Sequence, residues 1–150
     1  LTGGEPLLQT GIVELLKRLA EDNSLRVEIE TNGSVPLKHF MGFENAPGFT
    51  MDYKLPSSGM EKLMVLENFK YLSPKDTVKF VSGSIEDLQR TKEIIDCYGL
   101  LDKTRVYISP VFGSIELTDI VDFMVRNKLN GVNLQVQLHK IIWDPNKRGV

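Results

Sequence analysis

The chain opens on the stretch LTGGEPLLQ, in which two adjacent glycines and an acid precede a proline and an apolar run. Glycines at such a turn let main-chain N–H and C=O groups approach a ligand without interference from a Cβ atom. The lysine and the Ser/Thr of a phosphate-binding loop are absent, and the carboxylate of Glu5 would repel a phosphate. The stretch therefore favours a cationic or amino-bearing ligand beside Gly3, Gly4 and Glu5.

Two later stretches place further hydrogen-bonding side chains beside glycine or proline turns. In VEIETNGS, Thr31 and Asn32 follow a strand pattern, and MDYKLPSSGM carries Lys54, Ser57 and Ser58. The TNG sequence suits a type I′ hairpin turn, but the next clear strand lies far along the chain, so a strand-end loop that faces a ligand is favoured. For Lys54, the alternatives are a solvated lysine or a charge-assisted hydrogen bond to a ligand carboxylate.

Several expected strands carry one polar face. In VNLQVQLHK, Val132, Leu134, Val136 and Leu138 point one way, and Asn133, Gln135, Gln137 and His139 point the other; Glu28 and Glu30 lie opposite Val27 and Ile29, as Tyr107 and Ser109 lie opposite Val106 and Ile108. A strand buried between two helix layers would be apolar on both faces. The pattern therefore predicts an open or partial barrel with helices outside and a polar cavity inside.

Apolar spacing predicts the elements that position these residues. Helices are expected over 6–21, from 85 to a stop at Gly99, and from 117 to before Gly131, with a short helical stretch over 62–69 and strands over 26–31, 77–83, 105–111 and 132–140. Ser84 and Asp87 resemble a capping box. Helix-length connections favour parallel strands in an α/β fold, one domain over 1–150. The alternative is an antiparallel sheet with one face in water.

Composition and charge limit the classes of partner. The chain has 150 residues and a net charge of −2, with no basic stripe of the kind that binding to nucleic acid requires. No apolar run reaches the length of a membrane span, so a cytoplasmic location is expected. The single cysteine, Cys97, excludes an internal disulfide and an all-cysteine metal site built from this chain. Its place near a helix end predicts a buried or half-buried structural thiol.

TGGEPLLQ resembles the glycine-rich motif of the radical S-adenosylmethionine superfamily, which follows the second strand of a partial (β/α) barrel. The resemblance implies that Gly3, Gly4 and Glu5, with Thr2 beside them, receive the amino group of the methionyl part of the cofactor. Together, VEIETNGS, MDYKLPSSGM and the terminal LQVQLHKIIWDPNKRGV are similar to a compact branch of that superfamily, the 7-carboxy-7-deazaguanine synthase family. This closer resemblance spans nearly the whole chain.

The resemblance implies two sets of binding residues. For the cofactor S-adenosylmethionine they are Thr2, Gly3, Gly4, Glu5, Thr31, Asn32, Lys54, Ser57, Ser58 and Gln137; for the substrate 6-carboxy-5,6,7,8-tetrahydropterin they are Gly4, His139, Arg148 and Val150. For His139, a satisfied core histidine is the alternative. None of these residues is expected to be catalytic, because the cofactor carries out the radical chemistry. The implied reaction contracts the pterin ring with loss of ammonia, in queuosine biosynthesis.

The superfamily's [4Fe–4S] cluster needs three cysteines, which Cys97 cannot replace. The resemblance therefore implies cluster ligands upstream of Leu1, in an absent N-terminal βα unit, so that the chain as given would be inactive. It also implies Mg²⁺ and a flavodoxin-type reductant, and we expect a homodimer that covers an exposed sheet edge. Two alternatives stay open: a glycyl-radical activase acting on a partner protein, and a noncatalytic binding module that has lost the cluster region.

Overall fold

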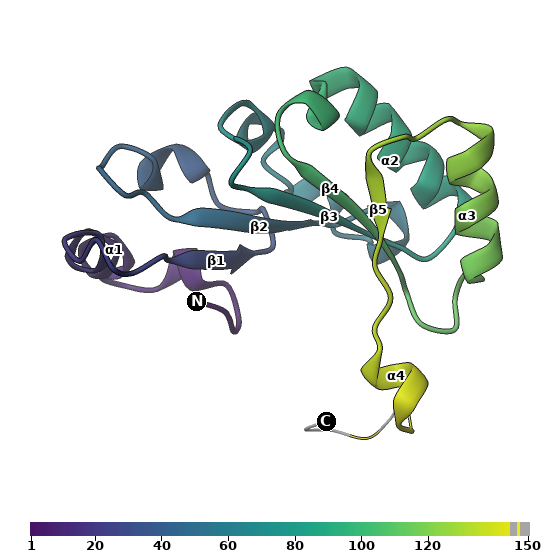
Figure 1. The fold of residues 1–150 in the computed structure, drawn as a ribbon, viewed down its shortest axis with the longest axis horizontal. Helices are drawn as coiled ribbons and strands as arrows, with labels where there is room; N and C mark the ends of the chain where they lie inside the picture. The colour runs from purple at the N-terminus through teal and green to yellow at the C-terminus, as the bar shows by residue number, and fades with distance from the viewer. Residues whose placement is uncertain (145–146, 148–150) are drawn as a thin grey trace.

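Five parallel strands form one sheet in the computed structural model, which describes residues 1–144 and 147. The strands are β1 (Glu28–Thr31), β2 (Gly48–Tyr53), β3 (Thr77–Ser82), β4 (Arg105–Pro110) and β5 (Val132–Leu134). They lie in the order β1-β2-β3-β4-β5, and every neighbouring pair is parallel (Figure 1). The predicted α/β fold of parallel strands is confirmed, and the antiparallel alternative is wrong.

Helices and single turns connect the strands. The α-helices are α1 (Ile12–Ala20), α2 (Ile85–Tyr98), α3 (Leu117–Arg126) and α4 (His139–Ile142), and the 3-10 turns are η1 (Pro6–Leu8), η2 (Leu37–Phe40), η3 (Pro56–Ser58), η4 (Glu61–Leu63), η5 (Leu66–Lys70) and η6 (Leu100–Asp102). The strands are parallel and follow one another in sequence order. Because crossover connections between parallel strands are right-handed, all of these connections lie on the same face of the sheet. Helices α2 and α3 lie together on that face (Figure 1). Within the described part of the chain, no helix has the length and apolar character needed to cross a bilayer.

The face of the sheet beneath α2 and α3 forms the core. Two rows of residues cross it in register: Met51, Val78, Val106 and Val132, followed by Tyr53, Phe80, Ile108 and Leu134. All of them are buried except Leu134, which is half-buried. Leu88, Ile94 and Ile120 from the two helices join the same hydrophobic cluster. Burial of this layer supplies the main driving force for folding.

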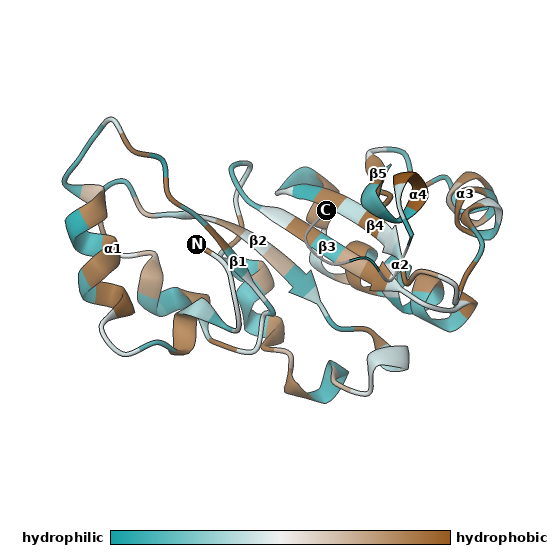
Figure 2. Cartoon of the chain, turned by 90° about the horizontal axis from the view of Figure 1, so that it is seen from below, coloured by the Kyte–Doolittle hydropathy of each residue, from teal (hydrophilic) through white to brown (hydrophobic). Residues whose placement is uncertain are grey.

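The opposite face of the sheet is polar. A row in register across it consists of Asp52, Lys79, Tyr107 and Asn133, and each of these residues is partly or fully exposed. Seen from below, hydrophilic and hydrophobic residues alternate along the strands (Figure 2). An open polar face opposite a helix-covered apolar face is the arrangement expected of a partial (β/α) barrel. The two-faced pattern predicted from the sequence is therefore confirmed for β1, for Val106, Tyr107 and Ile108 of β4, and for the three residues of β5, whereas Ser109 is buried.

The first predicted helix is interrupted. The sequence pattern over 6–21 folds as the η1 turn and the separate helix α1, because Gly11 adopts a left-handed φ of 80° at the start of α1. Leu8, expected in the apolar stripe, is 70% exposed as a result. The stretch over 62–69 is likewise divided between η4 and η5 rather than forming one helical segment.

The last predicted strand is shorter than expected. Strand β5 ends at Leu134, although the Gln135 N–H still donates to the Ile108 carbonyl at 2.9 Å. The next donor from β4 would be Pro110, which has no N–H, so the ladder stops. His139 therefore opens α4 instead of ending the polar face of a strand.

Two further expectations change. Residues 48–53, read from the sequence as part of a loop-rich segment, form β2, which lies between β1 and β3, with Phe49, Met51 and Tyr53 buried. Cys97 is exposed on α2, so the predicted buried or half-buried thiol is wrong. The predicted N-cap Ser84 and the stop at Gly99 are confirmed, because the Ser84 hydroxyl accepts from the Asp87 N–H and Gly99 ends the helix with a φ of 58°. The Asp87 carboxylate accepts from the Gly83 N–H, so it does not act as the second member of the predicted capping box.

Candidate functional site

The glycine stretch lies beside the first strand. The Leu1 nitrogen donates to the Glu28 carbonyl, and the Glu30 N–H donates to the Leu1 carbonyl at 2.9 Å, so Leu1 lies alongside β1. Gly3 and Gly4 follow with φ values of 97° and 58°, a region that strains other residues. Both are exposed, and a Cβ on either would meet no heavy atom within 4 Å. The backbone here is open to a ligand.

Glu5 ties this stretch to the loop that follows β1. Its side chain is 8% exposed, accepts from the Leu7 N–H at 3.1 Å and from the Asn32 N–H at 2.7 Å, and receives the Thr31 hydroxyl at 3.0 Å. The carboxylate thus caps the η1 turn and joins two loops. The sequence pattern predicts Glu5 at a ligand, and these internal hydrogen bonds are a further role.

The TNG sequence forms a strand-end loop, as expected. Thr31 ends β1 with its side chain buried against Glu5, and Asn32 accepts from the Ser34 N–H at 2.9 Å. Strand β1 pairs with β2 in parallel, so the hairpin alternative is wrong. Asn32 is half-buried, which leaves part of its side chain accessible at the sheet edge.

The loop after β2 carries the second group of predicted residues. The Lys54 ammonium lies 4.0 Å from one Asp52 carboxylate oxygen, and the Lys79 ammonium lies 3.9 Å from the other. These pairs are half-exposed, so they constrain Lys54 only weakly. Ser58 is exposed, and its hydroxyl donates to the Leu55 carbonyl of the same turn at 2.6 Å, whereas Ser57 contacts the start of α2.

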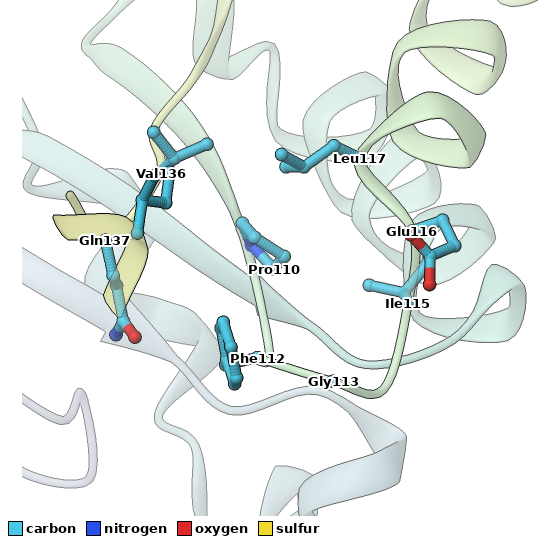
Figure 3. A pocket seen from close by; sticks show the side chains of 9 residues that line it. Pro110, Phe112, Gly113, Ile115, Glu116, Leu117, Val136 and Gln137 are labelled. Carbon is cyan, nitrogen blue, oxygen red and sulfur yellow. The ribbon is translucent and has the colours of Figure 1, made fainter. Parts of the chain in front are cut away.

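Gln137 lines a cavity of about 260 Å³ between the loop after β4 and the C-terminal segment (Figure 3). Its other walls are mainly apolar: Pro110, Phe112, Gly113, Ile115, Glu116, Leu117, Val136 and Ile141. Phe112 and Gly113, which form one side of this cavity, were not predicted from the sequence. Their position in the loop directly after β4 could have indicated them, since ligands of α/β proteins bind at the carboxyl ends of parallel strands.

The remaining predicted residues are dispersed. Gly3 and Thr2 line a separate hollow of about 310 Å³ beside α1, so Gly3 and Gln137 lie at different cavities. His139 is exposed on α4. Arg148 and Val150 lie outside the described residues. Among the residues that the structure does describe, no cluster of His, Cys, Asp and Glu could hold a metal ion.

The loops after β1, β2 and β4 leave the same edge of the sheet, because they follow the carboxyl ends of parallel strands. That edge borders the open polar face. Sheet and loops together define an α/β protein of the partial-barrel class, with its candidate ligand site above the carboxyl edge.

Comparison with known proteins narrows this class. No family model matches the chain. Curated proteins named 7-carboxy-7-deazaguanine synthase match it at 63% identity in Clostridium acetobutylicum (100% of this chain, 68% of the relative), 37% in Chlorobaculum tepidum (100% and 67%) and 36% in Methanospirillum hungatei (97% and 58%). The chain belongs to the 7-carboxy-7-deazaguanine synthase family, which is of the radical S-adenosylmethionine type. It spans about two thirds of the length of the first two relatives.

Proposed function

We propose that this chain forms the cofactor- and substrate-binding part of a lyase that converts 6-carboxy-5,6,7,8-tetrahydropterin to 7-carboxy-7-deazaguanine. The observation that carries this proposal is the 63% identity over the whole chain to a curated 7-carboxy-7-deazaguanine synthase. The product places the reaction in 7-deazaguanine and queuosine biosynthesis.

The residues at the carboxyl edge suit the methionyl part of S-adenosylmethionine. The open backbone of Gly3 and Gly4 can accept and donate hydrogen bonds to an amino acid group, and the half-exposed ammonium of Lys54 suits a carboxylate. Glu5 fixes the Gly3–Gly4 loop against Asn32 and so holds these groups in place. When bound, the cofactor supplies the radical chemistry of the reaction. The part proposed for these residues is binding and orientation.

The open polar face supports a role for the chain in holding a pterin. Asp52, Lys79, Tyr107 and Asn133 present donors and acceptors in one row, and a pterin ring carries both kinds of group along its edge. The apolar cavity beside Gln137 offers a surface for a flat ring. Substrate contacts by Gly4, His139, Arg148 and Val150 belong to the same proposal.

An iron–sulfur cluster does not fit the residues described here. The single cysteine of the sequence, Cys97, lies exposed on α2, away from the strand-end loops. We therefore derive no step of the reaction through a cluster, and propose that its ligands lie upstream of Leu1. The proposal also includes Mg²⁺ as a cofactor, a homodimer, a flavodoxin-type reductant and a cytoplasmic location.

The test is to extend the chain upstream to include the cysteines, reconstitute the cluster, and follow pterin consumption and product formation. Formation of 7-carboxy-7-deazaguanine is the expected result. A fully clustered protein that consumes no pterin would contradict the proposal. A glycyl radical placed on a partner protein would instead identify an activase, and a coding sequence without upstream cysteines would identify a noncatalytic module. Light scattering during size-exclusion chromatography measures whether the protein is a dimer.

A further inference from the structure

Asp87 is a buried carboxylate that joins two strand-end loops. It lies in the first turn of α2, with 0% of its surface exposed. It accepts from the Ser57 N–H at 3.0 Å, from the Ser57 hydroxyl, and from the Gly83 N–H at 2.7 Å. Ser57 belongs to the loop after β2, and Gly83 directly follows β3. The helix N-terminus further favours a negative charge at this position.

The carboxylate fixes the direction of the Ser57 hydroxyl. An ionised carboxylate can only accept hydrogen bonds, so the Ser57 proton points toward Asp87. The remaining lone pairs of the Ser57 Oγ are then available only to a donor. Since Ser57 is exposed, a ligand can reach them.

Gly83 permits this close arrangement. A Cβ at position 83 would lie 3.2 Å from the Ser57 Oγ and 3.6 Å from an Asp87 carboxylate oxygen. The first contact is tight enough that the Ser57 Oγ would have to shift by a few tenths of an ångström, whereas the second is an ordinary van der Waals contact. The absence of a side chain at Gly83 therefore forms part of the same local geometry.

We propose that Asp87 is a positioning residue: it holds the loop after β2 against the end of β3 and presents the Ser57 hydroxyl to the ligand as an acceptor. The group that contacts Ser57 is then a hydrogen-bond donor, of the hydroxyl or ammonium class. The identity of the ligand as S-adenosylmethionine rests on the proposed function. Asp87 itself contacts no ligand and acts through Ser57.

Asp87→Asn tests this arrangement with little change of shape. An amide has one accepting oxygen, and its NH2 group can donate to the Ser57 Oγ, which reverses that hydrogen bond and occupies the lone pair. We expect the dissociation constant for S-adenosylmethionine, measured by equilibrium dialysis on the cluster-loaded, upstream-extended protein, to rise about tenfold. Ser57→Ala should produce a similar rise. The double variant should bind no more weakly than Ser57→Ala, because both changes remove one contact.

Asp76 provides a matched control at the opposite edge of the sheet. It is also 0% exposed, and it accepts from the Phe49 N–H at 2.8 Å, the Ser73 N–H at 2.8 Å and the Ser73 hydroxyl at 2.7 Å. Asp76→Asn should lower the melting temperature about as much as Asp87→Asn and leave the dissociation constant unchanged. Hydrogen exchange of the chain without cofactor should speed up at Ser57 and Gly83 in Asp87→Asn alone.

The outcomes separate the two proposals. If the clustered wild-type protein binds no S-adenosylmethionine, the proposed function fails. If wild type binds it and Asp87→Asn binds equally well, or Asp76→Asn weakens binding to the same degree, the positioning role is overturned. If Asp87→Asn does not fold, Ser57→Ala and Gly83→Ala still test the positioning role. An unchanged dissociation constant for S-adenosylmethionine in both variants would overturn the inference.

Discussion

Two acidic side chains, Glu5 and Asp87, are buried at the carboxyl edge of the sheet and bind backbone N–H groups of other loops. A buried acceptor of this kind is costly to disturb, because its partners lose their hydrogen bonds away from water. At the scale of the residue, the candidate site is therefore held together by buried carboxylates.

Glu5→Gln should destabilise the protein. The carboxylate accepts from the Leu7 N–H at one oxygen and from the Asn32 N–H at the other, and an amide has only one accepting oxygen, so the free energy of unfolding should fall by about 1–3 kcal/mol. Urea unfolding followed by circular dichroism measures the change. Glu21→Gln, at an exposed position, is the control and should stay within about 0.5 kcal/mol of wild type. Equal losses in the two variants would contradict the role given to Glu5.

Tyr53 links stability to alkaline pH. Burial, together with the Glu61 carboxylate that its hydroxyl contacts at 3.1 Å, raises the pKa of Tyr53 to about 12. An unfolded tyrosine has a pKa of about 10. Because the folded pKa is the higher one, this stabilisation is complete below pH 10 and is lost as the pH rises from about 10 to 12.

Tyr53→Phe should therefore flatten the pH dependence of the unfolding free energy in that window. The tyrosine contribution amounts to roughly 2–3 kcal/mol. Urea unfolding between pH 9 and pH 12 measures it. A Tyr53→Phe profile parallel to wild type would show that the phenol does not carry this pH dependence.

At the scale of the element, the two ends of α2 were correctly predicted from the sequence. Ser84 and Gly99 bound α2 as expected, since both caps act within a few residues of the chain. Gly11 was not recognised as a break, because the apolar spacing of Leu8, Ile12 and Leu15 continues across it. The spacing of apolar residues predicts which residues could share one face of a helix. It does not predict a left-handed φ angle that interrupts the helix.

Ser84→Ala should weaken the start of α2. The serine hydroxyl accepts from the Asp87 N–H at 3.2 Å, and the loss of such a cap costs about 1 kcal/mol. Thermal unfolding measures the effect. Glu116, which precedes α3 and makes no capping hydrogen bond through its side chain, is the comparison. Glu116→Ala should change stability by less than about 0.5 kcal/mol, and a loss equal to that of Ser84→Ala would argue against the cap.

For the whole molecule, the division of the sheet into two faces organises both stability and function. Core side chains beneath α2 hold the strands in register, and the polar face is left open beside the strand-end loops. Aromatic packing joins these parts, since the Phe69 ring lies 4.7 Å from Tyr98 of α2 and 5.6 Å from Tyr53 of β2, centroid to centroid.

Phe69→Ala should lower the unfolding free energy by about 3–5 kcal/mol, because it leaves a cavity where strand, turn and helix meet. Guanidinium unfolding measures the loss. Phe112→Ala removes the same ring from a position that is 50% exposed and should cost far less. Comparable losses in the two variants would contradict the placement of Phe69 at this junction.

The sequence by itself determined the α/β class, the polar and apolar strand faces and the caps of α2, because these depend on spacing over a few residues. It also pointed to Thr2, Gly3, Lys54 and Gln137 through resemblance, and their ligand contacts stay predictions. It did not reveal β2, or that Cys97 is exposed.

Only the tertiary structure decided which distant groups meet. Glu5 contacts Thr31 across 26 positions of the chain, and Asp87 contacts Ser57 across 30. Strand β5 ends early because its neighbour carries Pro110. Such contacts follow from strand order and register, which bring loops that are remote in the sequence to one edge of the sheet. A pattern that spans only a few residues cannot predict which of these remote loops will meet.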